Sequence, residues 1–153
     1  MRLKVTSMDI VKEPNKILHT KVKKVEITPK VGGLIQDMKK LMIQSRGIGL
    51  AANQIGLDEA IFVIDENLAK ESNAPSVYIN PEVEPYSKLN EEMEEGCLSI
   101  PDTWLKIKRS KKVKIRSIDE NGKKIKFIAK GMLARVLQHE YDHLQGVLIT
   151  DKK

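Results

Sequence analysis

The stretch His139-Glu140-Tyr141-Asp142-His143 lies ten residues before the end of the 153-residue chain, and the interpretation of the whole sequence starts from it. Histidines four positions apart project from nearly the same face of an α-helix, because four residues make slightly more than one turn. The two imidazoles can therefore share one metal ion, and Glu140 lies where a general base for an attacking water is needed. The alternative is a solvated helix with two unrelated histidines. The chain has only three histidines in all, which favours the metal site.

The surrounding residues predict a helix from about Met132 to Gln145. Its single polar stripe consists of Arg135, Gln138, Asp142 and Gln145, and its other faces carry Met132, Leu133, Val136, Leu137, Tyr141 and Leu144. A helix that is apolar on most sides is usually buried. We therefore expect both histidines to lie inside the fold.

Upstream, the sequence predicts a mixture of helices and strands. A proline-initiated short helix at 14–19 precedes a segment at 21–25 that is either extended or a loop. Thr28 then precedes a helix that stops at Ser45-Arg46-Gly47. A glycine-rich, mostly uncharged stretch follows at 47–54. Strands are expected at 60–65 and at 76–80, where Pro81 ends the second one, before a polar stretch with the acidic cluster Glu91, Glu92, Glu94 and Glu95. Alternating strands at 111–119 and 124–129 are joined by a hairpin turn at 120–122.

This pattern predicts an α+β fold, with antiparallel β-sheets wrapped around a central buried helix that carries the HExxH motif. The length suits one domain over residues 1–153. The single cysteine, Cys97, excludes an internal disulfide and fits a reducing compartment. The sequence shows no secretion signal and no run long enough to cross a membrane. We expect a cytoplasmic protein, although a transit peptide cleaved beforehand stays open, and a monomer is the default for so compact a chain.

The net charge of +6 favours anionic neighbours such as RNA, the ribosome surface or acidic lipid, or else marks a lysine-rich soluble surface. Aromatic residues make up only 4% of the chain, so no platform for stacking bases is visible. We therefore expect no direct readout of nucleic-acid sequence.

Two histidines do not complete a hydrolytic metal site, because three protein ligands and a water are usual. One class of HExxH protease has a third histidine six residues after the second, but here Ile149 occupies that position. The third ligand must then come from upstream, where the candidates are His19 and Cys97. His19 lies in a short polar helix and is more typical of the surface. A thiolate binds divalent metals strongly, so the chemistry favours Cys97 over an inert buried thiol.

Three separated segments resemble the three motifs of the peptide deformylase family: GIGLAANQ at 47–54, EGCLS at 95–99 and QHEYDHLQG at 138–146. Their order and spacing match, and the resemblance extends over almost the whole chain. It implies a metal-dependent hydrolase that removes the formyl group from the N-terminal formyl-methionine of nascent polypeptides and releases formate.

The resemblance also implies roles for particular residues. Cys97, His139 and His143 would hold one divalent ion, Fe(II) in the native protein and often Zn or Ni in preparations. Glu140 would act as general base and then as general acid. The Gln54 side-chain amide and the Leu98 backbone N–H would donate to the developing oxyanion. Gly49 would hydrogen-bond the substrate backbone.

Two departures from the family pattern are visible. Asn53 occupies a position where the family usually has proline, which puts the stiffness of that loop in question. Only ten residues follow His143, so the chain is similar to a short form without the C-terminal helical extension. Proximity to the ribosome is expected from the substrate, but a contact made through that helix is not.

Other residues carry open alternatives. Ile48, Met132 and Val136 either line an apolar slot for the methionine side chain or pack in the core. Trp104 lies at the mouth of the cleft or caps the fold. Asp142 is expected to pair with Arg109 and so to orient the site, or else to form an exposed ion pair of little value. Glu95 is either a buried acid held by Arg109 or a substrate contact.

Two rival functions share some of these features. A metal-dependent endopeptidase would use the same helix with a different third ligand and an open groove. A non-enzymatic RNA-binding module would explain the charge, but binding alone requires neither Glu140 nor Gln54.

Overall fold

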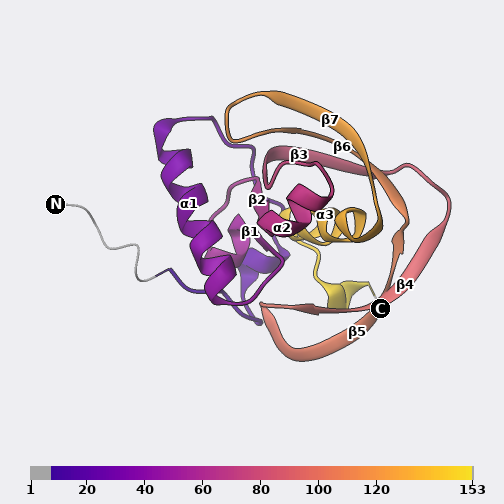
Figure 1. The fold of residues 1–153 in the computed structure, drawn as a ribbon. Helices are drawn as coiled ribbons and strands as arrows, with labels where there is room; N and C mark the ends of the chain where they lie inside the picture. The colour runs from indigo at the N-terminus through magenta and orange to yellow at the C-terminus, as the bar shows by residue number, and fades with distance from the viewer. Residues whose placement is uncertain (1–7, 153) are drawn as a thin grey trace.

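The computed structural model describes residues 8–152, and these residues form two antiparallel sheets and several helices. Strands β1 to β3 and β6 and β7 make a five-stranded sheet in the order β1-β2-β3-β6-β7, while β4 and β5 pair separately (Figure 1). The predicted α+β class is confirmed. The prediction of a single domain over the whole chain stays a prediction.

The bounds of the elements are as follows. The helices are α1 (Pro29–Gln44), α2 (Glu66–Glu71) and α3 (Gly131–Leu144), with short 3₁₀ helices η2 (Lys16–His19), η3 (Ala52–Ile55) and η4 (Ile149–Asp151). The strands are β1 (Gly49–Ala51), β2 (Ile61–Ile64), β3 (Val77–Pro85), β4 (Asn90–Cys97), β5 (Ile100–Ser110), β6 (Lys112–Ile118) and β7 (Lys124–Lys130). The predicted short helix, both long helices and the β6–β7 hairpin are all present.

The five-stranded sheet has helices on both of its faces. Successive side chains of a strand point to opposite faces, and β2 is fully buried because it serves both. Its residues Ile61 and Val63 pack with Ile35 and Met38 of α1. Its residues Phe62 and Ile64 pack instead in the cluster that contains the apolar side of α3. The core is therefore divided by the sheet into an α1 half and an α3 half.

Helix α3 is in contact with every strand of the five-stranded sheet and also with β5. Figure 1 shows the long strands β3, β6 and β7 curving past one side of α3, with β4 and β5 extending along the other. Eight residues of the helix are buried, among them Glu140 and His143. Strands therefore pack around α3 from several directions and bury Glu140 and His143.

The predicted end of the second strand at Pro81 is wrong, because β3 continues to Pro85. The pairing of β3 with β6 shifts register between Ile79 and Glu82, and Pro81 lies inside that irregularity. Proline has no N–H to donate, but at a bulge no ladder hydrogen bond is required of it. The chain therefore passes Pro81 without leaving the sheet.

The acidic stretch around residue 91 is strand β4, which the sequence did not predict. Its glutamates face lysines of β5, with Glu92 opposite Lys108 and Glu94 opposite Lys106. Opposite charges directly across a strand pair are favourable, so the charged residues support the pairing. Strands β1 and β5 and helix α2 were also not predicted. In the described part of the chain, no helix combines the length and apolar character needed to cross a membrane.

Candidate metal centre and active-site cleft

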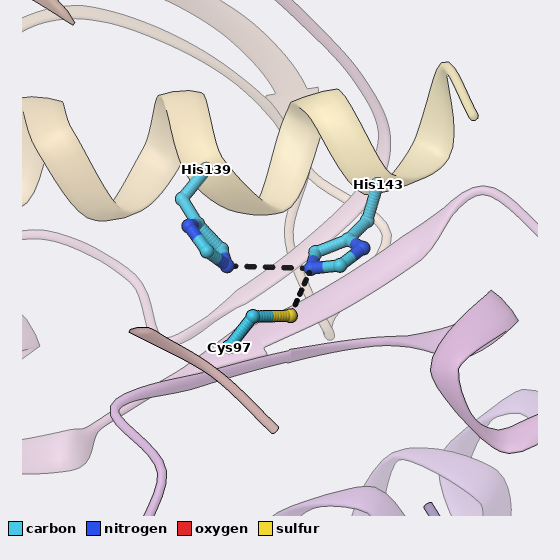
Figure 2. Close-up of side chains that lie close together, drawn as sticks. All are labelled: Cys97, His139 and His143. Atoms are coloured by element: carbon cyan, nitrogen blue, oxygen red, sulfur yellow. Dashed lines mark hydrogen bonds between the residues drawn. The ribbon is translucent and has the colours of Figure 1, made fainter. Parts of the chain in front are cut away.

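One face of α3 and the end of β4 bring together three side chains of types that can bind a metal ion, here called the candidate metal-binding group. His139 and His143 extend from the same side of the helix toward Cys97 (Figure 2). The Cys97 sulfur lies 3.4 Å from His143 Nε2, which lies 3.3 Å from His139 Nε2. All three candidate ligand atoms lie within 4.8 Å of one another.

These separations fit a divalent metal ion. In a tetrahedral site with Zn–N bonds near 2.1 Å and Zn–S bonds near 2.3 Å, ligand atoms are roughly 3.4 Å apart. The other candidate ligand, His19, is not near this group: its side chain is 46% exposed and its Nε2 lies 2.6 Å from Glu13 Oε1. Of the two upstream candidates, only Cys97 lies beside the paired histidines.

The local path of β4 explains how Cys97 reaches the helix. The β4–β5 pairing shifts register between Glu95 and Cys97, and Cys97 then pairs with Ile100 across a tight turn. Gly96 packs flat against the indole of Trp104, so that a Cβ at Gly96 would lie 2.8 Å from the ring. Trp104 is 68% exposed and lines the cleft, which places it at the mouth and not as a cap on the core.

Glu95 is a buried carboxylate that several donors surround. Arg109 donates to both of its oxygens, at 2.6 Å from Nε and 2.8 Å from its terminal nitrogen. Arg135 forms a further ion pair with Oε2. Burial opposes the charge of Glu95, but the hydrogen bonds from His139 and Arg109 outweigh it and hold its pKa well below the usual range. Of the two alternatives for Glu95, the geometry matches the buried acid held by Arg109.

Glu95 also orients one of the histidines. His139 Nδ1 lies 2.9 Å from Glu95 Oε1, so a proton on Nδ1 leaves Nε2 free to face Cys97 and His143. Arg109 extends the chain of contacts to α3, where its other terminal nitrogen donates to Asp142 Oδ2 at 2.8 Å. The expected pairing of Asp142 with Arg109 is thus present, and it is partly buried.

Glu140 lies on the same helix and faces the glycine-rich segment. Its side chain is buried, and its Oε1 has no hydrogen-bond partner among the described residues. Burial raises the pKa of Glu140 to about 7, which suits a group that takes up and releases a proton near neutrality. Gly49 provides the room for this carboxylate, because a side chain there would collide with it.

Gln54 is buried in η3 with both ends of its amide occupied. Its Oε1 accepts a hydrogen bond from the Ala51 N–H at 3.0 Å. Its Nε2 therefore faces the other way, 3.1 Å from Ser99 Oγ and 3.7 Å from the Cys97 sulfur. The amide nitrogen points at the candidate metal-binding group, as a donor to a reacting carbonyl oxygen would have to.

The N-terminal segment, for which the sequence predicted no part in the site except the candidate ligand His19, contacts all three motif segments. Its backbone N–H groups donate to three carbonyls: Val11 to Gln54, Glu13 to Ser99 and Val22 to Leu144. One acceptor lies in each of the three motif segments. Backbone contacts of this kind leave no signal in side-chain patterns, so the sequence could not indicate them.

The candidate metal-binding group opens into a cleft of about 540 Å³. Ile48 and Met132 line it and are 48% and 44% exposed, so neither is a core residue in this structure. Val136 is buried and lines the cleft while also packing in the core cluster of α3. The cleft wall further includes residues for which the sequence predicted no part in the site, namely Arg46, Met93, Glu94, Ile100, Pro101, Asp102, Thr103 and Arg135.

Comparison with known proteins identifies the class. The family model described as polypeptide deformylase matches residues 7–153. A curated peptide deformylase of Prochlorococcus marinus (strain MIT 9515) is 40% identical over 146 residues, which are 95% of this chain and 72% of that protein. The chain belongs to the polypeptide deformylase family.

Solved structures agree with this assignment. A peptide deformylase from Synechococcus elongatus in complex with actinonin superposes with a TM-score of 0.88 at 38% identity, over 99% of this chain and 83% of that one. A probable peptide deformylase from Synechococcus phage S-SSM7 gives a TM-score of 0.87 at 32% identity, over 96% of this chain and 100% of that one.

Proposed function

We propose that this protein is a metal-dependent amide hydrolase that removes the formyl group from the N-terminal formyl-methionine of nascent polypeptides and releases formate. The observation that carries the proposal is the meeting of Cys97, His139 and His143 with Glu140 and Gln54 at one cleft. Membership of the deformylase family supports the same reaction.

Cys97, His139 and His143 would hold one divalent ion. When bound, such an ion acts as a Lewis acid that lowers the pKa of water toward 7 and polarises a carbonyl group. Thiolate and imidazole donors accept Fe(II), Zn and Ni alike, and we infer Fe(II) as the native ion from the family resemblance. We further infer that α3 is the central scaffold around which the two sheets are arranged, since it contacts strands of both.

Glu140 is the residue that moves protons. Its buried carboxylate, with a pKa near 7, takes a proton from the attacking water and becomes a carboxylic acid. The oxygen of that water forms a bond to the formyl carbon. The C–N bond of the formamide then breaks, and Glu140 delivers the proton to the departing amine nitrogen, which gains a further proton from the formic acid so released. Formate and a free amino terminus leave, with Glu140 again ionised.

Gln54 and Leu98 stabilise the charge that develops on the formyl oxygen. The Gln54 nitrogen faces the candidate metal-binding group. From the family resemblance we infer that the backbone N–H of Leu98, the residue after Cys97, is the second donor. Removal of one such preorganised donor typically raises the barrier by about 3 kcal/mol.

The shape of the cleft selects the substrate. A formyl carbon carries only hydrogen, so a confined site admits it where an acetyl group would collide. Gly49 offers its backbone to the peptide, and Ile48, Met132 and Val136 form the apolar slot for the methionine side chain. The exposure of Ile48 and Met132 in the cleft wall supports this role over simple core packing, whereas Val136 also packs in the core.

The setting follows from the substrate. Formylated nascent chains are made in bacterial cytoplasm, and the curated relatives come from bacteria, so we place the protein there and near ribosomes. We propose that it acts as a monomer, without reading nucleic-acid sequence. An endopeptidase is disfavoured because Cys97 supplies the third candidate ligand, and an RNA-binding module because it has no use for a buried Glu140.

The direct test is release of formate from formyl-Met-Ala-Ser under anaerobic conditions by protein whose metal content has been measured. The wild-type protein should release formate, and acetyl-Met-Ala-Ser should give no acetate. Glu140→Gln, which keeps the shape of the side chain but cannot take up a proton, should abolish turnover while metal remains bound. Equal activity of wild type and Glu140→Gln would overturn the proposal.

A further inference from the structure

The amide of Asn53 makes an unusual contact with the metal-binding helix. Asn53 is fully buried in η3, next to Gln54 in the chain, and its Nδ2 donates a hydrogen bond to the backbone carbonyl of His143. A carbonyl oxygen only accepts, so the nitrogen end of the amide must be the end that faces it. The bond joins segments that are 90 residues apart in the chain.

The demands of folding do not explain this side chain. The carbonyl of His143 already accepts the Gly146 N–H at 3.0 Å, so the helix end has a partner without Asn53. The other end of the amide, Oδ1, is buried with no hydrogen-bond partner among the described residues. Burying an unpaired polar atom is unfavourable, and an apolar side chain of similar size would avoid that cost.

The contact joins two parts of the candidate site that lie far apart in the chain. The amide nitrogen of Gln54 in η3 points toward the Cys97 sulfur, which lies 3.7 Å away. Asn53, also in η3, donates to the backbone carbonyl of His143, which supplies a second candidate ligand. The turn that carries the oxyanion donor is therefore tied to two of the three candidate metal ligands.

We infer that Asn53 is a positioning residue: its bond to the His143 carbonyl fixes the Gln54 amide and the His143 imidazole relative to each other. The kinetic part of this inference rests on the proposed function. Its structural part, the orientation of His143 toward a bound ion, does not.

The test replaces Asn53 by leucine, which has a similar size and no donor. Asn53→Leu removes the unpaired Oδ1, so its melting temperature should be equal to or above that of the wild type. Its kcat for formyl-Met-Ala-Ser should nevertheless fall about tenfold with KM within about twofold, because small misplacement of a catalytic group is costly. The visible absorption bands of the anaerobic Co(II)-loaded protein should shift, since they report the geometry of the imidazole ligands.

Two further variants complete the experiment. Asn53→Ala adds no bulk and replaces Asn53→Leu if the leucine variant does not fold. Its kcat should fall and its Co(II) bands should shift in the same way. Asn80→Ala is the matched control, because the Asn80 amide also bonds backbone groups, the N–H and the carbonyl of Val25, and neither residue lines the cleft. That variant should lower the melting temperature and leave kcat and the Co(II) bands unchanged.

The outcomes separate cleanly. A wild-type kcat and an unshifted Co(II) spectrum in Asn53→Leu, or in Asn53→Ala where leucine prevents folding, would overturn the inference. The inference would also be overturned if Asn80→Ala lost as much kcat as the Asn53 variants, because the loss would then reflect a lower melting temperature and not the position of the site residues. If the wild type released no formate, the proposed function would fail, while the Co(II) comparison would still decide the orientation of His143.

Discussion

Gly49 and Glu140 face each other so closely that a Cβ at position 49 would lie 2.8 Å from the carboxyl carbon of Glu140. Real Cβ atoms do not approach other atoms that closely, so any side chain at this position must displace the carboxylate. Glu140 of α3 thus occupies the space that a side chain at position 49 of β1 would need, although 91 residues separate the two in the sequence (140 minus 49).

We therefore expect Gly49→Ala to reduce kcat/KM for a formyl-Met peptide about 100-fold, because a displacement near 1 Å of a catalytic group has that order of effect. Formate release at matched metal content measures it. Gly33→Ala is the control: Gly33 is exposed on α1 with nothing within 4 Å of the added Cβ. It should keep full activity and gain up to about 1 kcal/mol of stability. Unchanged activity in Gly49→Ala would contradict the close approach of Glu140.

Metal content should depend on the three converging side chains and not on the remaining histidine. The wild type should hold about one ion per chain after dialysis, whereas Cys97→Ser and His139→Ala should lose it, because two remaining ligands bind weakly. His19→Ala should retain the ion, since His19 is exposed and pairs with Glu13. Elemental analysis of each dialysed variant measures this. Retention of metal by Cys97→Ser would favour the endopeptidase and count against the assigned ligand set.

Removing the charge of Glu95 should destabilise the fold even without metal. In Glu95→Gln the buried Arg135 loses its carboxylate partner, while Arg109 keeps only Asp142. Leaving a buried charge such as that of Arg135 without a counter-charge costs about 3 kcal/mol. Urea unfolding of the metal-free protein at neutral pH measures the loss. Glu66→Gln, whose carboxylate pairs with Lys39 at the surface, is the control and should lose less than about 1 kcal/mol.

The same variant should change how stability depends on pH. The pKa of Glu95 is lowered in the folded protein, so its ionised form stabilises the fold above the unfolded pKa, about 4.3, and this contribution is lost as the pH falls toward the folded pKa. The free energy of unfolding of the wild type should therefore decline below about pH 4.3, and the decline should be shallower in Glu95→Gln. Parallel curves for the two proteins would contradict the lowered pKa.

Gly146 should be intolerant of substitution for two separable reasons. Its φ of +76° is unfavourable for other residues, and a Cβ there would lie 2.7 Å from the His19 carbonyl. Gly122 has a similar φ of +82° but open space around it, so Gly122→Ala measures the backbone effect alone, about 1–2 kcal/mol. Gly146→Ala should lose clearly more than Gly122→Ala in thermal or urea unfolding. Equal losses of stability in the two variants would show that the segment around His19 can move away from an added Cβ at position 146 at no cost in free energy.

Much of the fold could be predicted from local patterns. The α3 helix, the β6–β7 hairpin and the α1 helix were correct because each has a strong period and clear turn residues. Strand β4 was missed because its glutamates resemble a solvated loop until the lysines of β5 are placed opposite them. The end of β3 was misplaced at Pro81, since the bulge that accommodates a proline depends on the partner strand.

The candidate site shows the same division. The spacing of His139 and His143 indicated a shared ion, because residues four positions apart lie about one helical turn from each other on the same face. Cys97 was favoured over His19 by chemistry, and only the structure placed it beside the helix. The hydrogen bond from Asn53 to the His143 carbonyl was not predicted, since nothing in the spacing of two residues 90 positions apart indicates a contact.

The sequence by itself determined the chemistry: which side chains can bind a metal, take up a proton or donate to an oxyanion, and which segments form helices. These properties are local, being set by residue type and by periodicity within a few turns. Tertiary structure alone decided where the cleft opens, how Glu95 joins two arginines to His139, and why Gly49 must lack a side chain. Such relations depend on the packing of distant strands and helices at van der Waals distance, which no short stretch of the chain encodes.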